Sequence, residues 1–256
     1  MIHFIYLSRR TKWILAVLGS VFTLMFVLVG CGLFFPYSAD PSSPQTCVCF
    51  QHITRRFHSL NGSLQSSDSG FCINNQDYTG MQHITPYIPQ INDSICTLCQ
   101  EQLPYYGCDD SWYLPAPEVS PKAPLEFQLL SRQETEWGTI KMTFEVKGPS
   151  HMSLYLRPHA GVSLSSWSFG GGTPGFNLSG KYFVFYSHGL DAAAWNFWFE
   201  IQVDASPDEG WISLAISAHY FSGSDGRSEQ LESLLKRFPA WVFPASWIST
   251  YHMYRY

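Results

Sequence analysis

The stretch Ile140–Val146 reads IKMTFEV, and its alternation decides the fold of the chain. Apolar side chains stand at every second position, at Ile140, Met142, Phe144 and Val146, with polar residues between them. Successive side chains of a strand point to opposite faces, so this pattern is typical of a half-buried β-strand. The stretch therefore predicts one strand of a sheet that has an apolar face and a polar face.

Similar runs rich in aromatic and branched residues recur on both sides of this strand, separated by turns of Gly, Pro and Ser. They cover 125–130, 152–156, 162–169, 182–186, 197–203 and 212–218. Seven short strands in about 95 residues predict an antiparallel β-sandwich over residues 112–256. One C-terminal helix is expected after Ser228, where apolar residues follow at helical spacing and Pro239 ends the run. The predicted fold class is therefore mainly β.

The preceding segment, residues 36–111, contains six of the seven cysteines of the chain. They are Cys47, Cys49, Cys72, Cys96, Cys99 and Cys108. An even cluster in an oxidising compartment predicts a disulfide-rich framework, although the spacing alone does not choose the pairing. Zinc binding or a redox-active Cys-x-x-Cys remain alternatives. Turn residues interrupt the segment so often that no long element is expected, and four prolines in 112–124 predict a boundary.

Residues 13–35, WILAVLGSVFTLMFVLVGCGLFF, contain no charged residue and follow Arg9, Arg10 and Lys12. A run of this length spans a bilayer core of about 30 Å as one helix, and the positive flank predicts a cytosolic tail over 1–12. A cleavable signal peptide is the competing interpretation, but its apolar region is usually shorter. Membrane lipid is therefore the expected surrounding of 13–35, and the rest of the chain is expected in a lumen.

Three N-glycosylation sequons follow the apolar run, at Asn61, Asn92 and Asn177, where glycosylation can act in this topology. The net charge is −5, from 15 basic and 20 acidic residues. Basic residues form no run longer than two, so nucleic acid is not an expected partner.

Two tryptophans are candidates for a contact face. Alternation places Trp198 opposite the apolar members of its strand, and the same argument applies to Trp211. Large aromatic side chains on a polar face can mark a protein or glycan contact. The alternative is that another segment, such as the tail from Trp247 to Tyr256, covers both rings.

Catalytic motifs are missing from the sequence. It contains neither His-Glu-x-x-His nor Gly-x-Ser-x-Gly. Ser150-His151 and Ser187-His188 are adjacent pairs at strand edges, where neighbouring side chains are expected on opposite faces. Neither pair is therefore expected to form a local dyad.

Five short strings carry a resemblance to a known family. They are DYTG at 77–80, WYLPAPEVSP at 112–121, GPSHMS at 148–153, YFVFYSHGL at 182–190 and FPASW at 243–247. Together they resemble the C-terminal region of endoplasmic reticulum metallopeptidases of the M28 peptidase family, continuously from about Lys12 to Tyr256. The resemblance implies the last membrane helix and the lumenal C-terminal domain of that family.

The same resemblance implies that the zinc-dependent catalytic domain of the family lies outside this chain. That domain uses a His-x-Asp pair and a Glu-Glu element, and neither occurs in the sequence. No catalytic residue, metal ligand or cofactor is therefore expected here.

The combined prediction is a single-pass module of the endoplasmic reticulum membrane that acts by binding or assembly, with a lumenal protein or glycan as partner. Two alternatives remain: the chain is part of an active M28 zinc metallopeptidase whose catalytic domain lies elsewhere, or it is a glycan-binding β-sandwich.

Overall fold

The structure is a computed structural model that describes residues 11–31, 46–76, 84–89, 111–172, 174, 180–189, 193–204 and 210–256. Its internal contacts divide the chain into two compact units. One unit comprises Met1–Thr46 with Ala240–Phe243, and the other comprises Cys47–Pro239 with Pro244–Tyr256.

The first unit contains the helix α2, Thr11–Gly30. Its segment Lys12–Gly30 is long and apolar enough to cross a membrane. The predicted apolar helix is confirmed, and the predicted end at 32–35 lies outside the described residues. The large side chains of α2 are exposed, which suits a helix surrounded by lipid.

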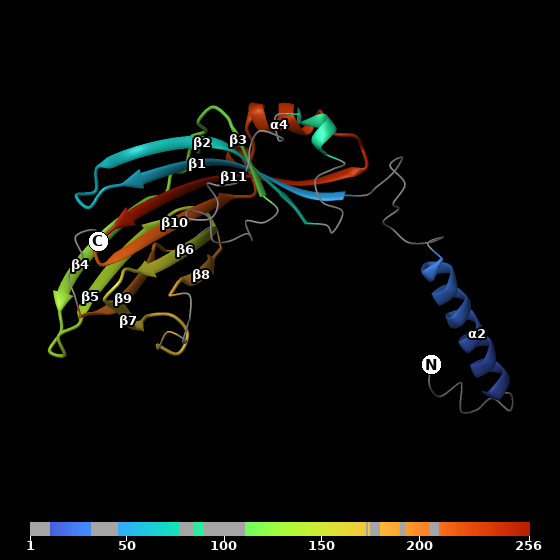
Figure 1. Ribbon diagram of the computed structural model, residues 1–256, viewed down its shortest axis with the longest axis horizontal. Helices are drawn as coiled ribbons and strands as arrows, with labels where there is room; N and C mark the ends of the chain where they lie inside the picture. The colour runs from blue at the N-terminus through green and yellow to red at the C-terminus, as the bar shows by residue number, and fades with distance from the viewer. Residues whose placement is uncertain are drawn as a thin grey trace. The chain divides into compact units, whose positions relative to one another are not determined.

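The second unit is built from two β-sheets (Figure 1). The seven-stranded sheet has the order β3-β2-β1-β11-β10-β6-β8, and the four-stranded sheet has the order β4-β5-β9-β7. The strand bounds are β1 Thr46–His58, β2 Leu64–Asn75, β3 Ser111–Pro115, β4 Glu126–Glu134, β5 Ile140–Lys147, β6 His151–Pro158, β7 Val162–Trp167, β8 Tyr182–Ser187, β9 Trp195–Val203, β10 Ile212–Tyr220 and β11 Val242–Arg255. Short helices are η1 Thr85–Tyr87, η4 Ser224–Gly226 and α4 Glu229–Leu235. The predicted mainly β class is therefore confirmed.

All seven strands predicted after residue 124 are present, as β4 to β10. In β5 the side chains of Met142, Phe144 and Val146 are buried, as the alternation predicted. The main apolar core lies between the two sheets and draws buried residues from β5, β6, β7, β9, β10 and β11. Phe144 is at its centre, with ring centroids 5.2 to 5.4 Å from those of Phe197, Phe199 and Tyr256.

The segment 36–111 departs from the prediction that it has no long element. β1 has 13 residues and pairs antiparallel with the 12 residues of β2. Residues 48–55 of β1 are buried without interruption, so no polar and apolar alternation marks the strand. Two of its buried polar side chains bond with other strands: Gln51 Nε2 donates to Ser249 Oγ at 2.6 Å, and Arg55 Nε donates to Asp68 Oδ1 at 2.6 Å.

The C-terminal tail from Trp247 to Tyr256 is the segment that the sequence offered as an alternative cover for Trp198 and Trp211. It forms most of β11, which lies between β1 and β10 inside the seven-stranded sheet. β1 and β2 therefore share one sheet with β10, β6 and β8. The sheet joins the two predicted segments because its hydrogen bonds connect strands that are distant in the sequence.

Candidate functional site

The structure places three of the six candidate disulfide cysteines, Cys47 and Cys49 on β1 and Cys72 on β2. Cys96, Cys99 and Cys108 lie outside the described residues, so the disulfide framework stays a prediction. Burial raises the pKa of the Cys49 thiol to about 11, and Gln76 Nε2 donates to Cys49 Sγ at 2.8 Å. Within the described ranges, no group of three or more His, Cys, Asp or Glu side chains could hold a metal ion.

Of the three sequons, Asn61 is described, whereas Asn92 and Asn177 lie outside the described residues. Asn61 is exposed in the turn between β1 and β2. Its Oδ1 accepts from the Ser63 backbone N–H at 3.0 Å and from Ser63 Oγ at 2.7 Å. The side chain therefore lies on the surface, in a local turn that its own sequon serine stabilises.

The two candidate contact tryptophans lie near different sheets. Trp198 is on β9 of the four-stranded sheet, whereas Trp211 precedes β10 of the seven-stranded sheet and packs against the main core. Each ring is paired with a cation: Lys141 Nζ is 4.0 Å from the Trp198 ring centroid, and the Arg132 guanidinium is 4.0 Å from that of Trp211. No common strand or sheet joins them, and a partner contact for either stays a prediction.

The pair Ser150-His151 differs from its prediction. Ser150 Oγ lies 2.9 Å from His151 Nδ1, so the two side chains do meet. Ser150 is in the bend before β6, and the alternation of a strand does not apply there. His151 also contacts the Phe221 ring at a centroid distance of 5.0 Å.

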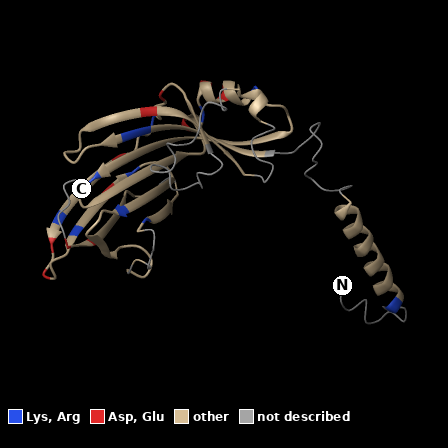
Figure 2. Ribbon diagram, in the orientation of Figure 1, with Lys and Arg blue, Asp and Glu red and all other residues tan. Residues whose placement is uncertain are grey.

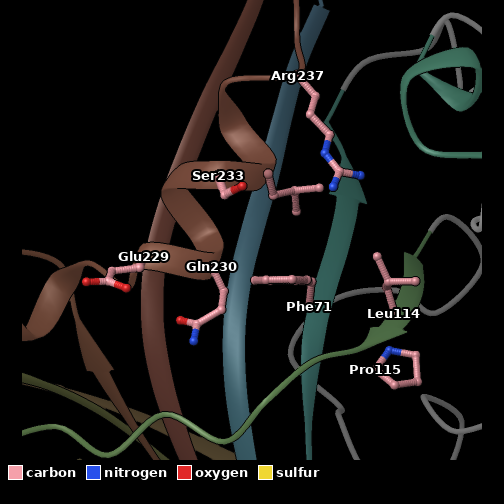
Figure 3. A pocket seen from close by; sticks show the side chains of 8 residues that line it. Phe71, Leu114, Pro115, Glu229, Gln230, Ser233 and Arg237 are labelled. Atoms are coloured by element: carbon pink, nitrogen blue, oxygen red, sulfur yellow. The ribbon is translucent and has the colours of Figure 1, made fainter.

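A surface pocket between α4 and the β2–β3 edge of the seven-stranded sheet is the strongest candidate site (Figure 3). It has a volume of about 550 Å³. The lining residues are Phe71 of β2, Leu114 and Pro115 of β3, and Glu229, Gln230, Ser233, Leu234 and Arg237 from α4 and its C-terminal end. Neither β2 nor β3 was predicted from the sequence, and for that reason the pocket was not predicted either.

The N-terminus of α4 is held by a buried histidine. Ser228 Oγ caps the helix by accepting from the Leu231 backbone N–H at 3.1 Å. His52 Nδ1 lies 2.8 Å from the same Ser228 Oγ, and His52 Nε2 lies 2.9 Å from the Pro117 carbonyl. Since that carbonyl only accepts, Nε2 carries the proton and Nδ1 accepts from Ser228. Burial lowers the pKa of His52, which favours this neutral form.

Beyond the C-terminal end of α4, aromatic packing holds the chain against β1. The ring of Phe238 lies 4.9 Å from that of Phe50, a fully buried residue of β1. Leu231 and Leu234 are buried on the inner side of the helix, as their predicted spacing required. The helix is therefore fixed at both ends, and the pocket beside it is preformed.

The pocket combines an apolar floor with a polar rim. Phe71 and Leu234 are buried at its base, and Leu114 and Pro115 extend the apolar surface along β3. In Figure 3 the Arg237 side chain reaches across toward β2, whereas Glu229 points away from Leu114. Among the described residues, β3 is also an edge strand of its sheet, with β2 as its neighbour. This arrangement suits an apolar side chain from a partner, with an acidic group near Arg237.

These features define a two-sheet β domain preceded in the sequence by a candidate membrane helix. The family description "Endoplasmic reticulum metallopeptidase 1, C-terminal domain" matches residues 44–254, and the chain belongs to this family. It is 50% identical over 264 residues to endoplasmic reticulum metallopeptidase 1 of Homo sapiens and of Mus musculus. Each match covers 99% of this chain and 29% of the relative, so the chain spans less than a third of these proteins.

Among solved structures, the yeast delta-COP-I mu-homology domain matches 83% of this chain and 96% of its own, with 11% identity. The TM-score is 0.32.

Proposed function

We propose that this chain is a non-catalytic binding module of an endoplasmic reticulum metallopeptidase 1-like protein, anchored by α2 with its β-unit in the lumen. The pocket beside α4 is the observation that carries the proposal. It is preformed, because both ends of α4 are fixed, and a preformed pocket loses little free energy to ordering when a partner binds. Its apolar floor, with Arg237 at the rim, suits an apolar side chain that has an acidic neighbour on the Arg237 side.

A second candidate function follows from the relatives, which are named as metallopeptidases and are much longer than this chain. In that case the β-unit belongs to an active M28 peptidase, and its pocket contacts another domain of the enzyme. The glycan-binding alternative is less favoured, because Lys141 already lies over the Trp198 ring that would stack on a sugar. No cofactor is proposed for this chain.

Filling the pocket tests the proposed function. Ser233→Trp places an indole among the pocket residues, and Glu232→Trp adds the same side chain one position away on α4, outside the pocket lining. We expect Ser233→Trp to weaken association with a lumenal partner at least tenfold, in quantitative co-purification from microsomes. Glu232→Trp should leave that association unchanged. Equal recovery of every co-purified protein with the two variants would exclude the pocket as the binding site.

The lumenal topology has its own prediction at Asn61. Because Asn61 lies in an exposed turn, we expect it to be glycosylated if the β-unit is lumenal. Glycosidase treatment of microsomal protein should lower the apparent mass, and Asn61→Gln should remove one glycan from the untreated protein. Gln at position 61 keeps the polarity of the turn, so folding should be retained. An unchanged mass in Asn61→Gln would show that this sequon is not used.

A further inference from the structure

Trp137 is presented to solvent at the tip of the β4–β5 hairpin. Its exposed fraction is 87%, the largest among the large apolar side chains of the described residues. In contrast to Trp198 and Trp211, it has no described ring or cation contact. A tryptophan offers a large apolar area with few rotatable bonds, and such residues commonly anchor protein interfaces.

Hydrogen bonds fix the conformation of the turn that carries Trp137. The Thr135 backbone N–H donates to the Thr139 carbonyl at 2.8 Å, and the two threonine hydroxyls lie 2.6 Å apart. The Gly138 N–H donates to the Thr135 carbonyl at 3.0 Å, and the positive φ of +71° at Gly138 favours glycine. The tip therefore holds Trp137 outward without requiring a partner to order it, which reduces the free energy that binding would cost.

The charge beside Trp137 indicates the partner surface. Glu134 and Glu136 precede it in the hairpin and both are exposed, and Figure 2 shows acidic residues at this hairpin. A complementary surface would combine an apolar pocket with positive charge. The pocket beside α4 offers an apolar surface at Phe71 and Leu114 and a positive charge at Arg237. Its acidic lining residue, Glu229, points away from Leu114 (Figure 3). Its volume of about 550 Å³ falls within the usual range for binding pockets.

The hairpin and the pocket of one molecule do not meet. Figure 1 shows the β4–β5 hairpin and α4 at opposite ends of the β-unit. An interaction between these two surfaces must therefore join two molecules.

We propose that Trp137 of one copy docks into the α4 pocket of a second copy, with Glu134 and Glu136 near Arg237. This inference rests on the proposed function of the pocket, and it names the partner as the chain itself. The contact is head-to-tail, because the two surfaces differ, so each bound pair leaves one free hairpin tip and one free pocket. Self-association should therefore continue beyond dimers as the concentration rises.

The test measures the mass of the full chain in detergent by sedimentation over a range of concentrations. The wild type should form dimers and larger species. Trp137→Ala should weaken association at least tenfold while keeping the melting temperature, because the side chain is almost fully exposed. Trp137→Phe retains an aromatic side chain and should restore much of the association. Phe221→Ala, which removes a 49% exposed ring elsewhere, is the matched control and should associate like the wild type.

A mixing experiment separates this contact from association through α2. The Trp137→Ala variant has an intact α4 pocket, and the Ser233→Trp variant has an intact hairpin tip. Each alone should be monomeric, and the mixture should form a one-to-one complex that grows no further. A monomeric wild type, or oligomers that Trp137→Ala leaves unchanged, would overturn the self-association inference. The proposed function would survive either result if Ser233→Trp still lost a different lumenal partner, and would fail separately if it did not.

Discussion

Replacing Phe144 with alanine is expected to lower the free energy of unfolding of the β-unit by about 3–5 kcal/mol. Phe144 is fully buried, and its ring lies 5.3 Å from that of Phe127 in addition to its contacts across the core. The substitution removes apolar area from the core and leaves a cavity that rigid strands on both sides prevent from closing.

Denaturant titration of the full chain, followed by tryptophan fluorescence, measures this loss. Phe185→Ala is the matched control, because Phe185 is 47% exposed on β8 and should cost about 1 kcal/mol or less. A loss for Phe144→Ala no larger than that of Phe185→Ala would contradict the position of Phe144 at the centre of the core.

Lowering the pH is expected to destabilise the β-unit through His219, a buried residue of β10. Burial, and to a lesser degree the nearby His151, lowers the pKa of His219 from 6.5 to about 4. The unfolded chain then binds a proton at a higher pH than the folded chain does. The neutral side chain therefore contributes stability that is complete above about pH 6.5 and is lost as the pH falls toward 4. Each unit of difference in the His219 pKa corresponds to about 1.4 kcal/mol. The free energy of unfolding therefore falls by about 3 kcal/mol over this pH range.

The hydrogen bonds around His219 explain why the neutral form fits. Gln51 donates to Ser249 Oγ, and this hydroxyl lies 3.0 Å from His219 Nδ1. His219 Nε2 lies 3.1 Å from Ser153 Oγ, and in the neutral ring one of the two nitrogens donates to its serine while the other accepts from its serine. Protonation makes both ring nitrogens donors, so the serine that donated to the ring is left with a buried hydroxyl hydrogen that needs a new acceptor.

Unfolding measured between about pH 7 and pH 4 checks this expectation. His219→Gln removes the titrating group but keeps a side chain that can hydrogen-bond, so its stability should depend less steeply on pH than that of the wild type. The control is His188→Gln, a histidine outside this network, which should retain the wild-type slope. Identical slopes for wild type and His219→Gln would rule out His219 as the source of the pH dependence.

The mainly β class, the strands from β4 to β10, the helix α4 and the apolar N-terminal helix were all predicted from the sequence. Each has a local cause. One face of β5 and of β9 is buried against the core, so apolar residues alternate along them, and Ser228 marks the start of α4 because its side chain caps the helix.

The long strands β1 and β11, and the pocket beside α4, were decided by tertiary structure. β1 is buried on both faces and pairs Gln51, His52 and the Nε of Arg55 with partners elsewhere in the chain, so its sequence shows no alternation. Phe71 and Arg237 both line the pocket, although 165 other residues separate them in the sequence. Local sequence patterns indicate which side chains of a segment face solvent and which face the core. A site between distant segments depends instead on strand pairings that form only in the folded sheet.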